Sequence, residues 1–162
     1  MNIITTITEN NIDPNDKTEK ENKMKYALSA RNQFEGTVKK VQTGAVNGIV
    51  VLDVNGEEIT ATISMGSIES LGLKEGVAAV AVIKATDVMV GKGTFRLSAR
   101  NQFQGKVTAV EEGAVNAIVK MEVLGGNTMT ATISMGSVRE LGLEPGVDAT
   151  AVIKATSVMI GI

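Results

Sequence analysis

The chain has 162 residues, a formal charge of −2 and a hydrophobic content of 43%, so it can bury a core and has no global positive field that would attract nucleic acid or an anionic membrane. It contains no cysteine and no histidine, which excludes disulfides, thiolate nucleophiles, common zinc sites and imidazole acid–base chemistry. Four aromatic residues are too few for a base-stacking surface. With no apolar run of membrane-spanning length and no charged leader before one, we expect a soluble cytoplasmic protein.

The chain begins with a polar segment and then repeats itself. Residues 1–23 carry five acidic and three basic side chains, so we expect a flexible tail, with an edge strand from its isoleucine-rich start as the alternative. The block Ser29–Phe34 returns as Ser98–Phe103, which indicates a tandem duplication. We therefore expect a tail over 1–23, a first domain over 24–91, a linker over 92–97 and a second domain over 98–162.

Each copy is rich in Val, Ile, Thr and Gly between turn residues, as is typical of a small β domain. In the first copy we expect strands over 28–41, 46–54 and 57–65, with a bend at Gly36 and a tight hairpin turn at Asn55-Gly56. A single helical turn should follow over 67–71, with Ser67 as its N-cap, and Ser137 and Glu140 should form a capping box in the second copy.

The copies end in an apolar strand, over 77–85 in the first, and a last short strand over 88–90. Strand alternation places Lys84 on the face of Val80 and Val82. Five strands and one short helix per copy predict an all-β chain of two tandem five-stranded barrels of the oligonucleotide/oligosaccharide-binding (OB) type.

Comparison of the two copies separates solvated charges from functional ones. Most charged positions change between the copies, whereas Arg31 matches Arg100 and Lys84 matches Lys154. No acidic residue is identical at matched positions, so the sequence offers neither a repeated general acid–base pair nor a magnesium-type site. Two repeated cations without a repeated carboxylate indicate an anionic ligand. The alternative is that the aliphatic part of the Lys84 side chain lies along the end of the strand and its ammonium group is in water.

Three sequence blocks give the chain a family resemblance. Ser-Ala-Arg-Asn-Gln-Phe opens each copy, Ile-Ser-x-x-Ser precedes Leu-Gly-Leu, and Val-Ile-Lys-Ala-Thr-x-Val-Met comes near the end. These blocks resemble the molbindins, the Mop or TOBE-type molybdate-binding domains. The resemblance implies OB-type barrels, assembly of three chains into a homotrimer, and oxyanion sites at interfaces between domains.

Carried over residue by residue, the resemblance implies one ligand set per copy. In the first copy the set is Ser29, Arg31, Val46 through its backbone, Ser64, Ser67, Lys84, Ala85 and Thr86. In the second copy it is Ser98, Arg100, Val115, Ser134, Ser137, Lys154, Ala155 and Thr156.

The function expected from this sequence is binding rather than catalysis. The ligand implied is molybdate, with tungstate as a second oxyanion, bound inside the cell for storage or homeostasis of molybdenum. The alternative is a molybdate-responsive module that signals to a protein partner. Hydroxyl and amide donors around one guanidinium and one ammonium suit a ligand whose oxygens only accept hydrogen bonds.

Overall fold

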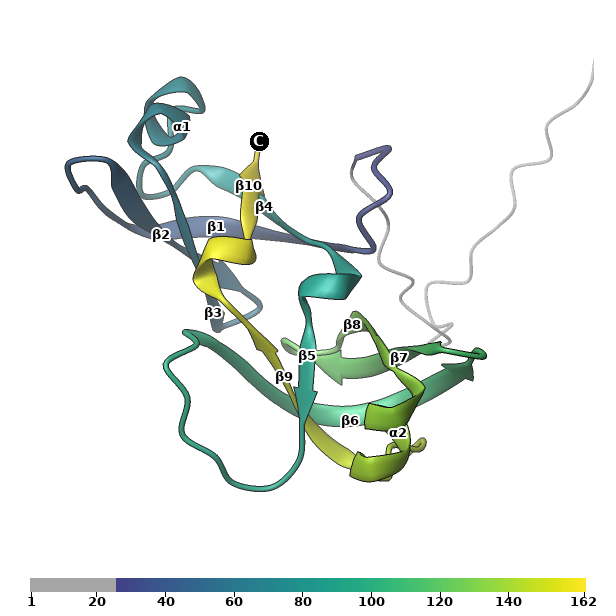
Figure 1. The fold of residues 1–162 in the computed structure, drawn as a ribbon. Coiled ribbons are helices and arrows are strands. Elements are labelled where there is room, and N and C mark those ends of the chain that lie inside the picture. Colours follow the sequence, from purple (N-terminus) through teal and green to yellow (C-terminus); the bar gives the residue numbers. More distant parts are fainter. Residues whose placement is uncertain (1–25) are drawn as a thin grey trace, which may run out of the picture.

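The computed structural model describes residues 26–162, in which two five-stranded antiparallel sheets carry nearly all the regular structure (Figure 1). The first sheet has the order β10 (Met159–Gly161), β4 (Ala78–Ile83), β1 (Asn32–Gln42), β2 (Asn47–Val54) and β3 (Glu57–Ser64). The second has the order β5 (Met89–Gly91), β9 (Asp148–Ile153), β6 (Asn101–Glu112), β7 (Asn116–Val123) and β8 (Asn127–Ser134). The helices are α1 (Met65–Ser70), α2 (Met135–Leu141) and the 3₁₀ turns η1 (Ala85–Asp87) and η2 (Ala155–Ser157).

This architecture confirms the predicted pair of five-stranded β units with one short helix each. The Asn55-Gly56 turn is also confirmed, since both residues have positive φ, 53° and 85°, as a tight hairpin turn of this kind requires. The expected tail and its alternative edge strand lie outside the described residues. Within 26–162, the helices are all too short to cross a bilayer.

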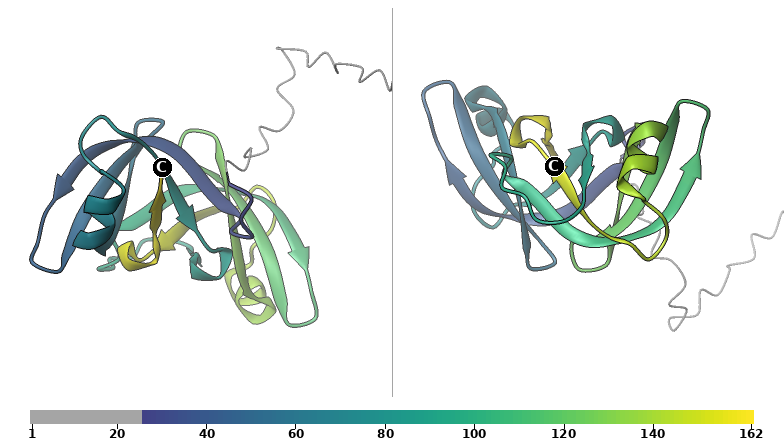
Figure 2. Two further views of the ribbon diagram at one scale, coloured as in Figure 1. Left: turned by 90° about the horizontal axis from the view of Figure 1, so that it is seen from above. Right: turned by 60° about the horizontal axis from the view of Figure 1, so that its bottom comes forward.

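The two copies exchange their last strands. β5 follows the first copy in sequence but pairs with β9 of the second sheet, and β10 at the end of the chain pairs with β4 of the first. Figures 1 and 2 show the two curled sheets side by side, with the exchanged strands between them. The curl brings β10 against β3, and β5 against β8, at the open edges of the sheets. Neither sheet is complete without residues of the other copy.

Burial follows the sequence pattern closely. β2 alternates between buried residues that face the core and half-buried ones, as a strand with one covered face should. β4 is buried continuously from Ala79 to Ile83, because both of its faces are covered. Gly36 in β1 lies where a Cβ would come 2.3 Å from the backbone oxygen of Asp53, so a glycine is required at this bend. Buried residues of both copies form one continuous core.

An aromatic ring covers each exchanged strand. A Cβ on Gly161 of β10 would lie 2.8 Å from the hydroxyl oxygen of Tyr26, and a Cβ on Gly91 of β5 would lie 2.6 Å from a ring carbon of Phe95. Tyr26 and Phe95 occupy equivalent positions of the two copies, three residues before the serine of the repeated Ser-Ala-Arg block. The Tyr26 hydroxyl is buried without a hydrogen-bond partner among the described residues.

Two buried asparagines join the copies reciprocally. The side chain of Asn32 donates to the backbone oxygen of Thr130 and accepts from its backbone nitrogen, both at 2.8 Å. Asn101 makes the same two contacts, also at 2.8 Å, with Thr60. Thr130 and Thr60 lie on the edge strands β8 and β3, so each asparagine satisfies backbone groups that would otherwise be unpaired. These contacts fix where the residues before β1 and β6 lie against the opposite copy.

Candidate functional site

The repeated cations lie next to each other at one end of the β1–β4 and β6–β9 pairs. Asn32 is in register with Ile83, and Asn101 with Ile153. Arg31 and Lys84 therefore both lie one residue beyond a paired position, and the same holds for Arg100 and Lys154. The register places a guanidinium and an ammonium at the same corner of each sheet.

In the second copy this corner is a cavity of about 400 Å³. Five of the predicted ligand residues line this cavity. Leu97, Ala99 and one residue of the exchanged strand β5 complete the lining. The predicted residues are Ser98, Arg100, Lys154, Ala155 and Thr156. The neighbour from β5 is Met89, which belongs to the first copy by sequence. The site is thus composed of both copies.

The 3₁₀ turns place the rest of this group at the boundary between the copies. η1, which begins after Lys84 and contains Ala85 and Thr86, packs against β8 of the second copy, and η2 packs against β3 of the first. The prediction that Lys84 continues a strand is wrong. β4 ends at Ile83, and the backbone nitrogen of Asp87 donates to the oxygen of Lys84 to close the 3₁₀ turn. The Lys84 side chain is exposed, whereas Val80 and Val82 of β4 are buried.

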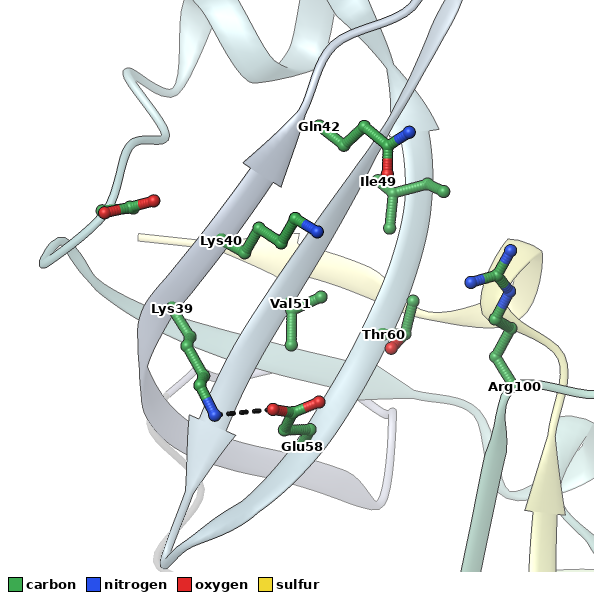
Figure 3. A pocket seen from close by; sticks show the side chains of 9 residues that line it. Lys39, Lys40, Gln42, Ile49, Val51, Glu58, Thr60 and Arg100 are labelled. Atoms are coloured by element: carbon green, nitrogen blue, oxygen red, sulfur yellow. Dashed lines mark hydrogen bonds and ion pairs between the residues drawn. The ribbon is translucent and has the colours of Figure 1, made fainter.

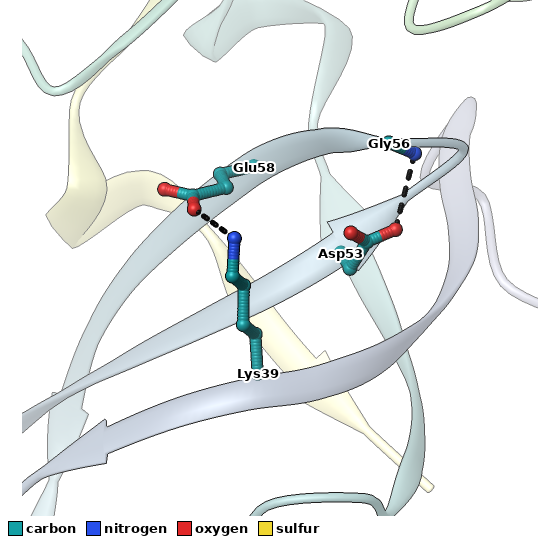
Figure 4. A network of polar contacts seen from close by, with 4 residues as sticks. All are labelled: Lys39, Asp53, Gly56 and Glu58. Atoms are coloured by element: carbon teal, nitrogen blue, oxygen red, sulfur yellow. Dashed lines mark hydrogen bonds and ion pairs between the residues drawn. The ribbon is translucent and has the colours of Figure 1, made fainter.

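None of the four repeated cations has an ion pair within residues 26–162. The salt bridges given by the described residues lie elsewhere, at Lys39–Glu58 (2.6 Å), Lys106–Asp148 (2.6 Å) and Lys120–Glu111 (3.8 Å). Figure 4 shows the Lys39–Glu58 salt bridge. The hydrogen bond from Lys39 to Glu58 raises the pKa of Lys39 above its ordinary value. The unpaired cations are solvent-exposed in a single chain, so an anion can reach them.

The other predicted ligands form a second group at the start of each helix. Ser64, and not Ser67, is the N-cap of α1: its hydroxyl accepts from the backbone nitrogen of Ser67 at 3.1 Å, and the two hydroxyl oxygens are 2.9 Å apart. The backbone oxygen of Val46 accepts from the nitrogen of Met65 at 2.9 Å. The Val46 carbonyl is thus engaged, and the backbone N–H is the only group of this residue that can donate to an anion.

The second copy repeats this arrangement and corrects a second prediction. Ser134 is the N-cap of α2, accepts from the backbone nitrogen of Ser137 at 3.1 Å and lies 2.9 Å from its hydroxyl. Met135 donates to the oxygen of Val115 at 2.9 Å. The capping box predicted at Ser137 and Glu140 does not form, because the helix begins three residues earlier. Within one chain, the cavity at Arg100 is lined by the first group of ligands and by none of the second.

Arg100 also borders another hollow, of about 480 Å³, on the outer face of β1–β3 (Figure 3). Lys39, Lys40, Glu58 and Glu75 supply its other charges. The two lysines are replaced by Thr108 and Ala109 in the second copy, so their charges are not duplicated.

The two amides that follow each arginine were expected among the donors that suit an anion, but their side chains bind backbone groups instead. Asn32 and Asn101 bridge the copies, and Gln33 and Gln102 bind the backbone of the loop that carries the arginine. Their identity in both copies was a usable signal, because amides inside a repeated block have partners to satisfy.

Known proteins resemble this chain in sequence and in fold. The family model of the TOBE domain matches residues 28–90 and 97–160. The "Molybdenum transport protein ModE" of Herbaspirillum seropedicae is 40% identical over 143 residues, which cover 86% of this chain and 53% of that protein. This chain therefore spans about half the length of that relative. The "Probable molybdenum-pterin-binding protein" of Haemophilus influenzae is 54% identical over 67 residues, 41% of this chain and 97% of that protein.

A solved structure covers both copies. A crystal structure of the cytoplasmic molybdate-binding protein ModG with molybdate bound superposes with a TM-score of 0.83 at 42% identity. The match covers 85% of this chain and 99% of that one. The likeness therefore extends to the tandem arrangement as well as to the single copy.

Proposed function

Since the chain belongs to the TOBE domain family, with two copies of the domain in tandem, we propose that it binds molybdate in the cytoplasm for storage or homeostasis of molybdenum, and that tungstate binds at the same sites. It acts by binding and not by catalysis. The related ModG protein, which is similar over nearly its whole length, has been crystallised with molybdate. The names of the shorter relatives also refer to molybdenum.

The observation that carries this proposal is the duplicated pair of arginine and lysine, which has no carboxylate partner among residues 26–162. Molybdate is a tetrahedral dianion, so one guanidinium and one ammonium balance its charge. Hydrogen bonds to charged groups contribute about 1.5–3 kcal/mol each, and the hydroxyls of Ser98 and Thr156 border the same cavity. A few such bonds hold an oxyanion without a metal cation.

Assembly into a homotrimer completes the proposal. In one chain the cations are exposed and the Ser64 and Ser134 groups lie apart from the Arg100 cavity. Both copies also expose large apolar side chains at matched positions near the predicted ligands. These are Leu28 and Leu97, Val46 and Val115, and Met89 and Met159. Contact between chains would bury these residues and bring serine donors of one chain to the cations of another.

Isothermal titration calorimetry with molybdate, tungstate, sulfate and phosphate tests the binding. We expect saturable heat with molybdate from the wild-type chain and its loss in a variant that carries both Arg31→Ala and Arg100→Ala. No heat with molybdate at micromolar protein would refute the proposal. Native mass spectrometry with and without molybdate tests the assembly, since a trimer has three times the mass of one chain and each bound anion adds a fixed increment.

A second candidate function is a molybdate-responsive module that acts on a protein partner. It is favoured by relatives of which the match covers only about half, so that a pair of similar domains accompanies other sequence. Affinity capture with and without molybdate separates the two functions. A partner retained in only one condition supports signalling, and identical protein lists support storage. The formal charge of −2 and the scarce aromatics give no support for a nucleic-acid or membrane partner.

A further inference from the structure

The loop that carries Ser29 and Arg31 is bound by a side chain that follows it. The amide nitrogen of Gln33 donates to the backbone oxygens of Tyr26 and Ala30, both at 3.2 Å. The amide oxygen of the same side chain accepts from the backbone nitrogen of Tyr26 at 2.9 Å. Gln33 is 5% exposed, so water does not compete for these bonds. Both ends of the loop are therefore tied to the first strand.

The equivalent loop of the second copy is bound differently. The amide nitrogen of Gln102 donates to the backbone oxygens of Ala99 at 2.8 Å and of Leu97 at 3.3 Å. Gln33 reaches back seven residues to Tyr26, whereas Gln102 reaches back five to Leu97. Gln102 is also exposed. The loop before Arg100 is thus held over a shorter span, by bonds that water can replace.

The difference bears on binding because an ordered loop loses less conformational entropy when it receives a ligand. Fixing one backbone residue costs about 1–2 kcal/mol, and a loop that is already fixed does not incur that cost on binding. Gln33 holds the carbonyl of Ala30, the residue between Ser29 and Arg31. At the other end it holds both backbone groups of Tyr26, whereas the bonds of Gln102 end at Leu97. The rings of Tyr26 and Phe95 both lie on an exchanged strand, so the loops differ in the two bonds that Gln33 makes to Tyr26.

We propose that Gln33 is a positioning residue for Ser29 and Arg31, and that the two duplicated oxyanion sites of the chain are consequently unequal. The site built on Arg31 is preorganised and binds molybdate more tightly. The site built on Arg100 orders its loop on binding and is weaker. This inference rests on the proposed function, since it concerns the affinity of the same sites.

Two matched variants of the full chain test this inference: Gln33→Met and Gln102→Met. Methionine keeps the side-chain length and suits a buried position, but it lacks the amide. The wild-type titration with molybdate should fit two classes of site. Gln33→Met should weaken the tighter class about tenfold, the size expected when one more residue must be ordered on binding. Gln102→Met should change the weaker class less than threefold.

Amide hydrogen exchange of the anion-free proteins gives a second readout that a general loss of stability would not mimic. In the wild type we expect residues 27–31 to exchange more slowly than residues 96–100. Gln33→Met should accelerate exchange in 27–31 without changing the strands β1 and β4. Uniform acceleration throughout the chain would show a structural role and overturn the positioning role.

The outcomes separate this inference from the proposed function. Wild-type protein that gives no heat with molybdate refutes the function, and the site assignment with it. Heat in the wild type with an unaltered isotherm in Gln33→Met overturns the positioning role alone. Equal weakening by the two variants would also overturn it, because it would show that the two loops are equivalent.

Discussion

Asn32→Ala tests how the two copies are held together. The Asn32 side chain is fully buried, and it pairs with both backbone groups of Thr130 on the edge strand β8 at 2.8 Å. The substitution leaves the backbone N–H and C=O of Thr130 without partners, and Thr130 is only 7% exposed. An unpaired buried polar group costs about 1–3 kcal/mol. We therefore expect Asn32→Ala to lower the free energy of unfolding by about 2–6 kcal/mol, from the two groups together.

Asn101→Ala is the matched control. It removes the same two 2.8 Å bonds, but to Thr60, which is half-buried. Water can then replace the lost partners, so the cost is the net value of two hydrogen bonds, about 1–3 kcal/mol in all. The two variants thus differ in burial and not in bonding.

Equilibrium urea unfolding of the anion-free proteins measures both values. Since domains are stable by only about 5–15 kcal/mol, the larger loss should shift the midpoint of Asn32→Ala well below that of Asn101→Ala. A cost under 1 kcal/mol for Asn32→Ala, or equal costs for the two variants, would refute the reasoning. It would mean that the buried amide does not support the junction.

Three further predictions follow from single features. Tyr26→Phe removes a buried hydroxyl without a partner, a group that costs about 1–3 kcal/mol, so Tm should rise, while Phe95→Tyr should lower it. A lower Tm for Tyr26→Phe would show that the hydroxyl has a partner. Arg31→Ala or Lys84→Ala should weaken molybdate binding by calorimetry and change the anion-free unfolding free energy by less than about 0.5 kcal/mol, because both side chains are exposed; a large loss of stability would instead mark a structural role. Deletion of residues 159–162 should leave β4 with an open edge and cause association in size-exclusion chromatography. An unaltered elution volume and urea midpoint would show that the exchanged strand is dispensable.

Local features of this fold were predictable because their causes are local. The Asn55-Gly56 turn follows from two residues that accept positive φ, and the duplication is visible in the sequence itself. The helix start was harder, because Ser64 and Ser67 both fit the N-cap preference. The structure uses Ser64, so the helix includes Met65 and Gly66, and Ser67 supplies the N–H that is capped.

The exchange of the last strands between the copies could not be predicted from the alternation of apolar and polar residues. β5 and β10 have nearly the same sequence, and they pair with β9 and β4 in equivalent registers, with Met89 opposite Val152 and Met159 opposite Val82. The repeated sequences therefore fit either pairing. The choice depends on whether the chain crosses to the other copy at η1 and η2, which strand periodicity does not encode.

The site was predictable in its residue types and less so in its geometry. Comparison of the copies identified Arg31 and Lys84, which the register brings to one corner. Strand alternation placed Lys84 on a strand, because alternation cannot show that the strand has ended and that η1 begins at the next residue. The separation of the serine group from the cations depends on how the sheets curl, which is a property of the packed chain.

Equilibrium dialysis of the full chain against molybdate, with protein-bound molybdenum quantified by mass spectrometry, tests molybdate binding directly. We expect the wild type to retain molybdenum in fixed proportion to protein, and the variant with both Arg31→Ala and Arg100→Ala to retain little. Wild-type protein without molybdenum, or a variant that retains as much as the wild type, would contradict this expectation.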